Sequence, residues 1–193
     1  MAKLYMMIGI PSSGKSNVVR KLKRQTKAKV YSSDKTRLLL NMDPSDDNEN
    51  IDLFEYMYDL IRKELSAGND VILDSTNTFR CYRQPFLDSL NEDVEVIGVL
   101  MMRKLENCLS SNAIRKNKID DKVIIDQYSR YDFPLKEEGF DSFMIFYTDN
   151  DKDSLAEDDG DLYKSMFVNN GISPEEKLQK VQQLIRSKSV HTS

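Results

Sequence analysis

One octapeptide limits the folds open to this chain more than any other feature of the sequence. It matches the pattern GxxxxGK(S/T) at every fixed position and reads Gly9-Ile10-Pro11-Ser12-Ser13-Gly14-Lys15-Ser16. A short apolar run at residues 3–8 precedes it, and a helical pattern at residues 15–26 follows it. A turn of this kind directs backbone N–H groups and the positive end of the helix toward one point. The octapeptide therefore predicts a phosphate-binding loop in an α/β fold.

The residue types in this loop suit a nucleoside triphosphate with a magnesium ion. Glycines allow the tight bend at little strain. Lys15 is expected to reach the β- and γ-phosphates, which makes it a candidate catalytic residue, and the Ser16 hydroxyl is expected to bind Mg²⁺. A turn that merely joins strand to helix is the alternative. The residues predicted to bind the nucleotide are Gly9, Pro11, Ser12, Ser13, Gly14, Lys15, Ser16 and Asn17.

Apolar runs alternate with helical patterns along most of the chain. The expected strands lie at residues 3–8, 29–31, 71–73, 94–102 and 143–147. Strands that alternate with helices form a parallel sheet with right-handed crossovers. The sequence thus predicts an α/β protein with a P-loop NTPase-type parallel sheet of about five strands flanked by helices. Helical patterns at residues 105–115 and 122–131, joined by a basic loop, predict a helical lid.

The expected domain covers residues 1–150, and the amino-acid composition changes after it. Residues 149–161 hold seven acids and a single lysine, so a mobile acidic loop is expected there. Ser173-Pro174-Glu175 has the serine cap, early proline and acid that begin a helix. We therefore expect residues 151–193 to form an acidic loop and a C-terminal helix packed on the domain.

Charge and composition exclude several classes of protein. The chain of 193 residues has a net charge of −4, so it is not expected to coat nucleic acid non-specifically, because such binding depends on neutralising phosphates. Ten Lys and Arg against one acid in residues 1–37 still allow a local anion pocket. One histidine and two separated cysteines exclude a zinc finger and a disulfide framework. No run approaches the ~20 apolar residues of a membrane span, so we expect a cytoplasmic protein without a membrane partner.

Asp34 follows the expected second strand, and the carboxyl ends of such strands line the ligand crevice. Its carboxylate could accept the proton of an attacking hydroxyl group. Arg37 lies one helical turn later on the same face, where it could bind an acceptor phosphate. A helix cap at Asp34 and a surface role for Arg37 are the alternatives, and the residues alone leave both open.

Asp74 ends the apolar run Val71-Ile72-Leu73 in the manner of a Walker B element. It is therefore expected to hold a magnesium-bound water or to orient Ser16. Asn77 and Arg83, just beyond this strand, are predicted to contact the substrate. For Arg83, a solvated charge on a helix is the alternative.

The basic loop of the expected lid, Arg115-Lys116-Asn117-Lys118, carries a further candidate. An arginine that closes over a phosphoryl group stabilises the charge that develops during its transfer. Arg115 is thus predicted to be catalytic and to contact the nucleotide. A flexible basic loop without such a role is the alternative.

Taken together, these segments resemble the 5′-kinase domain of bacteriophage and bacterial polynucleotide kinases. The resemblance rests on the octapeptide, Ser32-Ser33-Asp34 with Arg37, Asp74-Ser75-Thr76-Asn77 with Arg83, Asn112-Ala113-Ile114-Arg115, and Glu138-Gly139-Phe140. It implies transfer of the γ-phosphate of ATP to a 5′-hydroxyl of DNA or RNA, with ATP and Mg²⁺ as cofactors. Asp34 would then be the general base, Arg37 would bind an acceptor phosphate, and Arg115 would contact the ATP phosphates.

The resemblance also implies nucleic acid 5′ ends as partners, a role in nucleic acid repair, and a cytoplasmic location in a bacterial or phage-infected cell. The residues after the fifth strand are too few for a phosphatase or ligase module, so a kinase domain standing alone is expected, and a homo-oligomer is compatible with it. Two alternatives stay open. One is a P-loop kinase of a small metabolite, nucleotide sugar or tRNA-attached group, and the other is a non-catalytic nucleotide-binding switch.

Overall fold

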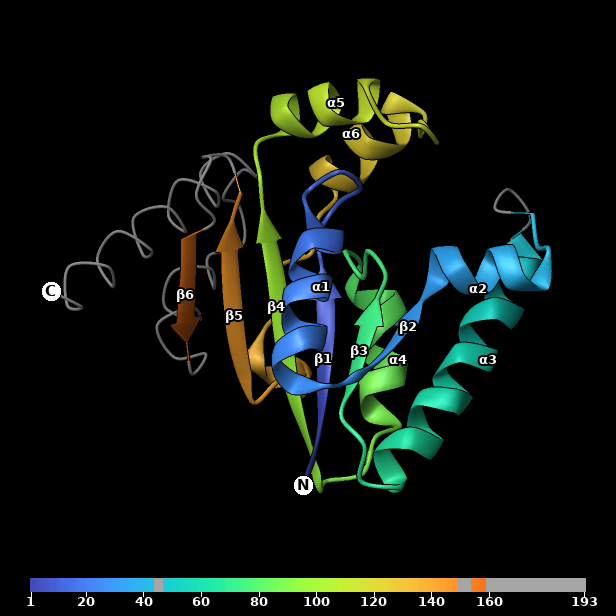
Figure 1. Ribbon diagram of the computed structural model, residues 1–193, viewed down its shortest axis with the longest axis vertical. Helices are drawn as coiled ribbons and strands as arrows, with labels where there is room; N and C mark the ends of the chain where they lie inside the picture. The colour runs from blue at the N-terminus through green and yellow to red at the C-terminus, as the bar shows by residue number, and fades with distance from the viewer. Residues whose placement is uncertain (44–46, 149–153, 159–193) are drawn as a thin grey trace, which may run out of the picture.

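A six-stranded sheet in the order β2-β3-β1-β4-β5-β6 forms the centre of the molecule (Figure 1). The computed structural model describes residues 1–43, 47–148 and 154–158. The first five strands pair in parallel, as the sequence predicted. The strands are β1 Ala2–Ile8, β2 Lys29–Ser32, β3 Val71–Asp74, β4 Val94–Met102, β5 Ser142–Tyr147 and β6 Ser154–Asp158.

Strand β6 lies within the stretch for which the sequence predicted only a mobile loop, and that prediction is wrong for residues 154–158. The strand pairs antiparallel with β5, from Phe143 opposite Asp158 to Tyr147 opposite Ser154. The outer edge of β5 offers unpaired backbone N–H and C=O groups, and β6 pairs with these groups. The rest of the acidic stretch and the expected C-terminal helix lie outside the described residues.

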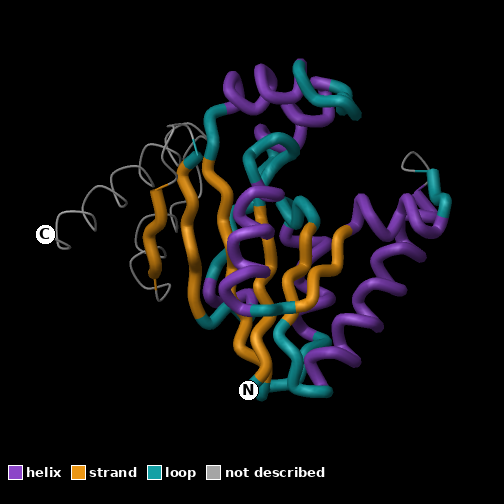
Figure 2. Tube along the Cα trace, in the orientation of Figure 1, coloured by secondary structure: helices purple, strands orange, loops and turns teal. Residues whose placement is uncertain are grey.

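Helices cover both faces of the sheet. Helix α1 packs on one face, while α3 and α4 pack on the other (Figures 1 and 2). Because both faces are covered, the central strands are apolar along nearly their whole length, as parallel strands usually are. The helices are α1 Lys15–Thr26, α2 Ser33–Leu40, α3 Asp47–Ser66, α4 Arg80–Asp88, α5 Leu105–Ala113, α6 Asp121–Ser129 and the 3₁₀ helix η1 Lys136–Glu138.

Helices α5 and α6 form the predicted helical lid above the carboxyl ends of the strands (Figure 1). A small apolar cluster of Ile10, Cys108 and Ile124 joins the lid to the loop that follows β1. The lid is therefore packed directly on the octapeptide. Among the described residues, no helix combines the length and the apolar character that a membrane crossing requires.

Candidate active site

The octapeptide forms a tight loop between β1 and α1. The N–H group of Gly9 donates to the Thr76 carbonyl at 2.9 Å, which ties the loop to the chain beyond β3. A Cβ atom at Gly9 would lie 2.7 Å from the Cβ atom of Met101, so only glycine fits there. Ser12 and Gly14 have positive φ angles of 62° and 96°, which turn the chain into α1. We refer to residues 9–16 as the phosphate loop.

Lys15 points back into the phosphate loop. Its Nζ atom donates to the carbonyl oxygens of Gly9 and Ile10, each at 2.7 Å. Burial lowers the pKa of Lys15 to about 8, and the nearby Asp74 carboxylate opposes this shift. The Lys15 ammonium group therefore lies within the loop and loses its proton at a lower pH than an exposed lysine does.

Other groups of the loop also suit an anion. The Ser12 and Ser13 hydroxyls are buried and have no hydrogen-bond partner among the described residues. The first turn of α1 contains no acidic residue, and Ser16 and Asn17 are exposed there. The positive end of the helix thus meets unsatisfied donors at one point, which favours a bound phosphate.

Asp74 and Ser16 provide oxygen atoms that fit Mg²⁺. Asp74 ends β3, beside β1, and its burial raises the pKa of the carboxyl group, while Lys15 lowers it. The described part of the chain contains no cluster of three or more His, Cys, Asp or Glu side chains suited to a metal. Mg²⁺ commonly binds through one or two protein oxygens together with phosphates and water, so the few donors present fit this ion.

Asp34, Arg37 and Arg115 come together from two separate parts of the chain. Asp34 lies in the first turn of α2 with 77% of its side chain exposed. An Arg37 guanidinium nitrogen lies 3.9 Å from the Asp34 carboxylate, and an Arg115 nitrogen approaches it to 3.8 Å from the lid. The carboxylate predicted as the general base thus has one arginine on its own helix and one on the lid.

A neutral side chain holds Arg37. Its NH2 atom donates to the Asn50 side-chain oxygen on α3 at 2.5 Å, and its Nε atom is buried without a hydrogen-bond partner among the described residues. An amide partner fixes the guanidinium without neutralising its charge. Arg37 therefore keeps its charge beside Asp34, and its predicted role in binding an acceptor phosphate stays a prediction.

The structure corrects the predictions for Arg83 and Asn77. Both were expected to contact substrate, but Arg83 is completely buried and binds Glu138 through two bonds, of 2.6 and 2.9 Å. The Asn77 amide is also buried and donates to the Met7 carbonyl at 2.8 Å. A buried charge is stable only when it is paired, and Glu138, far away in sequence, supplies the partner. Both side chains thus hold the backbone next to the site in place: Asn77 binds the end of β1, and Arg83 binds the Asn77 carbonyl.

Sequence reasoning missed two residues that contact the phosphate loop. The Arg103 guanidinium donates to the Ser12 carbonyl at 2.8 Å, and the Thr148 hydroxyl donates to the Ser13 carbonyl at 2.9 Å. Arg103 directly follows β4, and Thr148 directly follows β5. Their positions at the carboxyl ends of β4, which adjoins β1, and of β5, which adjoins β4, could have indicated them, because parallel strands end at the same edge of the sheet.

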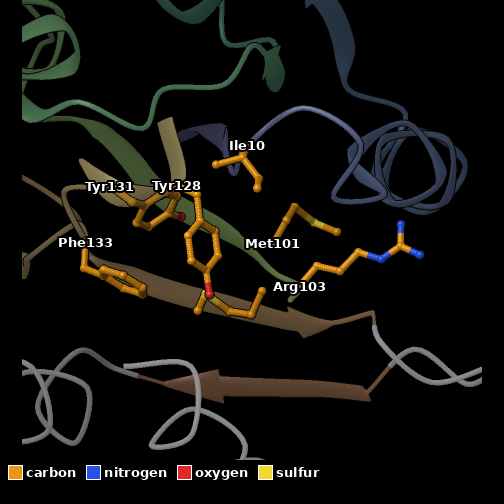
Figure 3. Close-up of a pocket in the computed structure, with 7 residues that line it drawn as sticks. Ile10, Met101, Arg103, Tyr128, Tyr131 and Phe133 are labelled. Atoms are coloured by element: carbon orange, nitrogen blue, oxygen red, sulfur yellow. The ribbon is translucent and has the colours of Figure 1, made fainter. Parts of the chain in front are cut away.

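A small pocket lies beside the phosphate loop, below the lid (Figure 3). Its lining is mainly apolar and aromatic, and burial raises the pKa of Tyr131 within it. None of Asp34, Arg37 and Arg115 lines this pocket. The lining residues are Ile10, Met101, Met102, Arg103, Tyr128, Tyr131 and Phe133.

Comparison with protein families extends this description. The family model AAA_33, described as an AAA domain, matches residues 4–134, which is more than half of the chain. The chain belongs to the AAA_33 family. The match begins in β1 and ends beyond α6, so the AAA_33 region includes the phosphate loop, Asp34 and the lid. The sequence matches none of the curated proteins with which it was compared.

Solved structures share the AAA_33 fold at low sequence identity. One is the Pnkp1/Rnl/Hen1 RNA repair complex, with 19% identity and a TM-score of 0.60, covering 65% of this chain and 42% of that chain. A sugar kinase from Janibacter sp. HTCC2649 has 12% identity and a TM-score of 0.62 and covers 100% of both chains. The Mycobacterium tuberculosis APS kinase CysC, in complex with AMPPNP and APS, has 16% identity, a TM-score of 0.57 and coverage of 96% and 98%. These likenesses confirm the predicted P-loop kinase-like fold.

Proposed function

We propose that this protein is an ATP-dependent kinase that phosphorylates the 5′-hydroxyl of a DNA or RNA end. The observation that carries the proposal is the meeting of Asp34, Arg37 and Arg115 at the sheet edge that holds the phosphate loop. A base, an arginine beside it and a lid arginine are groups suited to transfer from a triphosphate to an alcohol. Among the described residues Asp34 is largely exposed, which favours an acceptor that is the end of a long chain.

In the proposed reaction, the acceptor hydroxyl gives its proton to the Asp34 carboxylate as its oxygen attacks the γ-phosphorus. A new oxygen–phosphorus bond forms, the bond to the β–γ bridging oxygen breaks, and ADP leaves with that electron pair. Lys15 and Arg115 would neutralise charge on the phosphates, and Arg37 would hold an acceptor phosphate. Ser16 and Asp74 would hold Mg²⁺, which, when bound, neutralises further phosphate charge.

A second candidate is a kinase of a small metabolite. It is supported by the sugar kinase and the APS kinase, whose structures align with nearly the whole of this chain, whereas the RNA repair complex covers 65% of it. A small acceptor would use the same base and lid. The two candidates differ only in what binds beside Arg37.

A transfer assay with radiolabelled ATP tests the proposal. The acceptors are DNA and RNA oligonucleotides with 5′-hydroxyl ends, the same oligonucleotides with 5′-phosphate ends as a control, nucleosides, and simple sugars. We expect label on the 5′-hydroxyl oligonucleotides only. Label on a nucleoside or sugar alone would support the second candidate, and ATP binding without transfer to any acceptor would indicate a nucleotide-binding switch.

Affinity for ATP should fall as the pH rises through the pKa of Lys15, which is about 8. Below that pH the ammonium attracts phosphate, and above it the neutral amine does not. We expect the Kd for ATP to increase about tenfold between about pH 7 and about pH 9. Calorimetric titration measures this change. The Lys15→Met variant should bind weakly and show no such dependence, and a constant Kd for the unmodified protein would contradict the prediction.

A further inference from the structure

The backbone carbonyl groups of the phosphate loop need hydrogen-bond donors, and residues of the loop itself supply only part of them. A loop that turns its N–H groups toward a phosphate must turn carbonyl groups the other way, and buried carbonyls require donors. Lys15 donates hydrogen bonds to the carbonyl oxygens of Gly9 and Ile10. The carbonyls of Ser12 and Ser13 lie in the middle of the loop, where the chain adopts positive φ angles.

Two side chains from outside the loop bind those middle carbonyls. Arg103 donates to Ser12 at 2.8 Å, and Thr148 donates to Ser13 at 2.9 Å. The two bonds join residues that are 91 and 135 positions apart in the sequence. They are possible because β4 pairs with β1 and β5 pairs with β4, which brings the ends of all three strands together.

Thr148 is fixed on two sides. Its own N–H group donates to the Met102 carbonyl at 3.1 Å, so its backbone is held against the residue before Arg103. A Cβ atom on Gly14 would lie 3.6 Å from the Thr148 hydroxyl and methyl groups, which places this side chain against the loop backbone. The donor therefore has little freedom to leave the Ser13 carbonyl.

Arg103 binds the residue whose backbone is the least favourable in the loop. Ser12 has a φ of 62°, a conformation that residues with a side chain seldom adopt. The Arg103 bond stabilises the carbonyl orientation that this conformation produces. Because Arg103 also lies just before α5, it connects the loop to the base of the lid.

We propose that Arg103 and Thr148 are positioning residues for the nucleotide. By holding the Ser12 and Ser13 carbonyls away from the cradle, they keep the loop N–H groups directed at the β- and γ-phosphates. Neither residue needs to touch the nucleotide for this effect. The inference rests on the proposed function only in so far as the protein binds ATP, and not on the identity of the acceptor.

The first test uses Thr148→Val, which keeps the shape of the side chain and removes the hydroxyl. We expect the Kd for ATP and for tripolyphosphate to increase about tenfold, since a buried carbonyl loses its donor. Thr148→Ser, which restores a hydroxyl, should return both values close to those of the unmodified protein. Thr26→Val is the matched control, because it removes a 2.9 Å hydroxyl–carbonyl bond at the far end of α1, and it should leave both values unchanged.

The second test uses Arg103→Met, which keeps the aliphatic stem and removes the donors. We expect a comparable loss of ATP affinity, an increase in KM for ATP, and an unchanged KM for the acceptor. Arg103→Lys should recover part of the loss. Arg130→Met is the control for removal of a charge, because that arginine pairs with Asp126 on the exposed side of α6.

The outcomes separate the two proposals. If Thr148→Val and Arg103→Met are folded and bind ATP within twofold of the unmodified protein, the positioning role is overturned, whatever the acceptor. The same conclusion follows if Thr148→Ser binds as weakly as Thr148→Val. If the unmodified protein binds ATP but transfers no phosphate, the proposed function fails while the binding comparison still decides the role of Arg103 and Thr148.

Discussion

Replacement of Asp34 by asparagine is expected to lower turnover by about 10²–10⁴, the usual contribution of a general base. Asparagine has nearly the same shape, but it carries no charge to attract Arg37 and Arg115, and it does not accept a proton at neutral pH. Because Asp34 is largely exposed and its arginine contacts are 3.8 and 3.9 Å long, stability should hardly change. The Kd for ATP should also stay near that of the unmodified protein.

This experiment measures initial rates at saturating ATP with whichever acceptor is labelled in the transfer assay, and it measures ATP binding separately. Asp126→Asn is the matched control, since Asp126 is also an exposed carboxylate beside an arginine on a helix. Nearly normal turnover in Asp34→Asn would refute the assignment of the base. Loss of ATP binding together with turnover would indicate that Asp34 acts on the nucleotide.

Replacement of Glu138 by alanine is expected to lower the free energy of unfolding by about 3–5 kcal/mol, because it leaves the Arg83 charge buried without its partner. Arg83 and Glu138 are both fully buried and are joined by two bonds. Arg83 also donates to the Asn77 carbonyl at 3.1 Å, and the Glu138 carboxylate accepts from the Leu135 N–H group. The loss therefore extends to the loop after β3 and to η1.

Urea unfolding measures this effect. Arg83→Met should be similarly harmful, because it leaves a buried carboxylate, whereas the double variant Arg83→Met/Glu138→Leu should recover much of the loss, since no unpaired charge remains. Arg130→Met, which breaks an exposed pair, should have little effect. A Glu138→Ala protein as stable as the unmodified one would contradict this account of the buried pair.

The parallel sheet, the phosphate loop and the lid could be predicted because each has a local signal. The octapeptide fixes a strand before it and a helix after it, and strands covered on both faces are continuous apolar runs. Asp34 and Arg115 come from distant segments: Asp34 was predicted because strand ends share an edge, and Arg115 because it lies in the basic loop of the lid. Their proximity in the structure agrees with the sequence, whereas their roles await the experiments above.

Other features had no local signal. A charged residue on a short helix, such as Arg83, is usually exposed to solvent, so the local sequence does not indicate that it is buried. Its burial depends on the ion pair with Glu138, which is distant in the sequence. Strand β6 has the sequence Ser-Leu-Ala-Glu-Asp within an acidic stretch, which is not typical of a strand, and it pairs antiparallel with β5. The bonds from Arg103 and Thr148 depend on side-chain directions that spacing in the sequence does not specify.

The position of β1 in the sheet has a consequence for how the chain folds during its synthesis. Leu4 pairs with Val71 and Ala2 pairs with Val94, so both neighbours of the first strand are made long after it. Contacts between distant residues form slowly, because a long loop must close before they stabilise anything. Strand β1 is therefore translated before either of its neighbours and completes its pairing only once β4, which begins at Val94, has also been made.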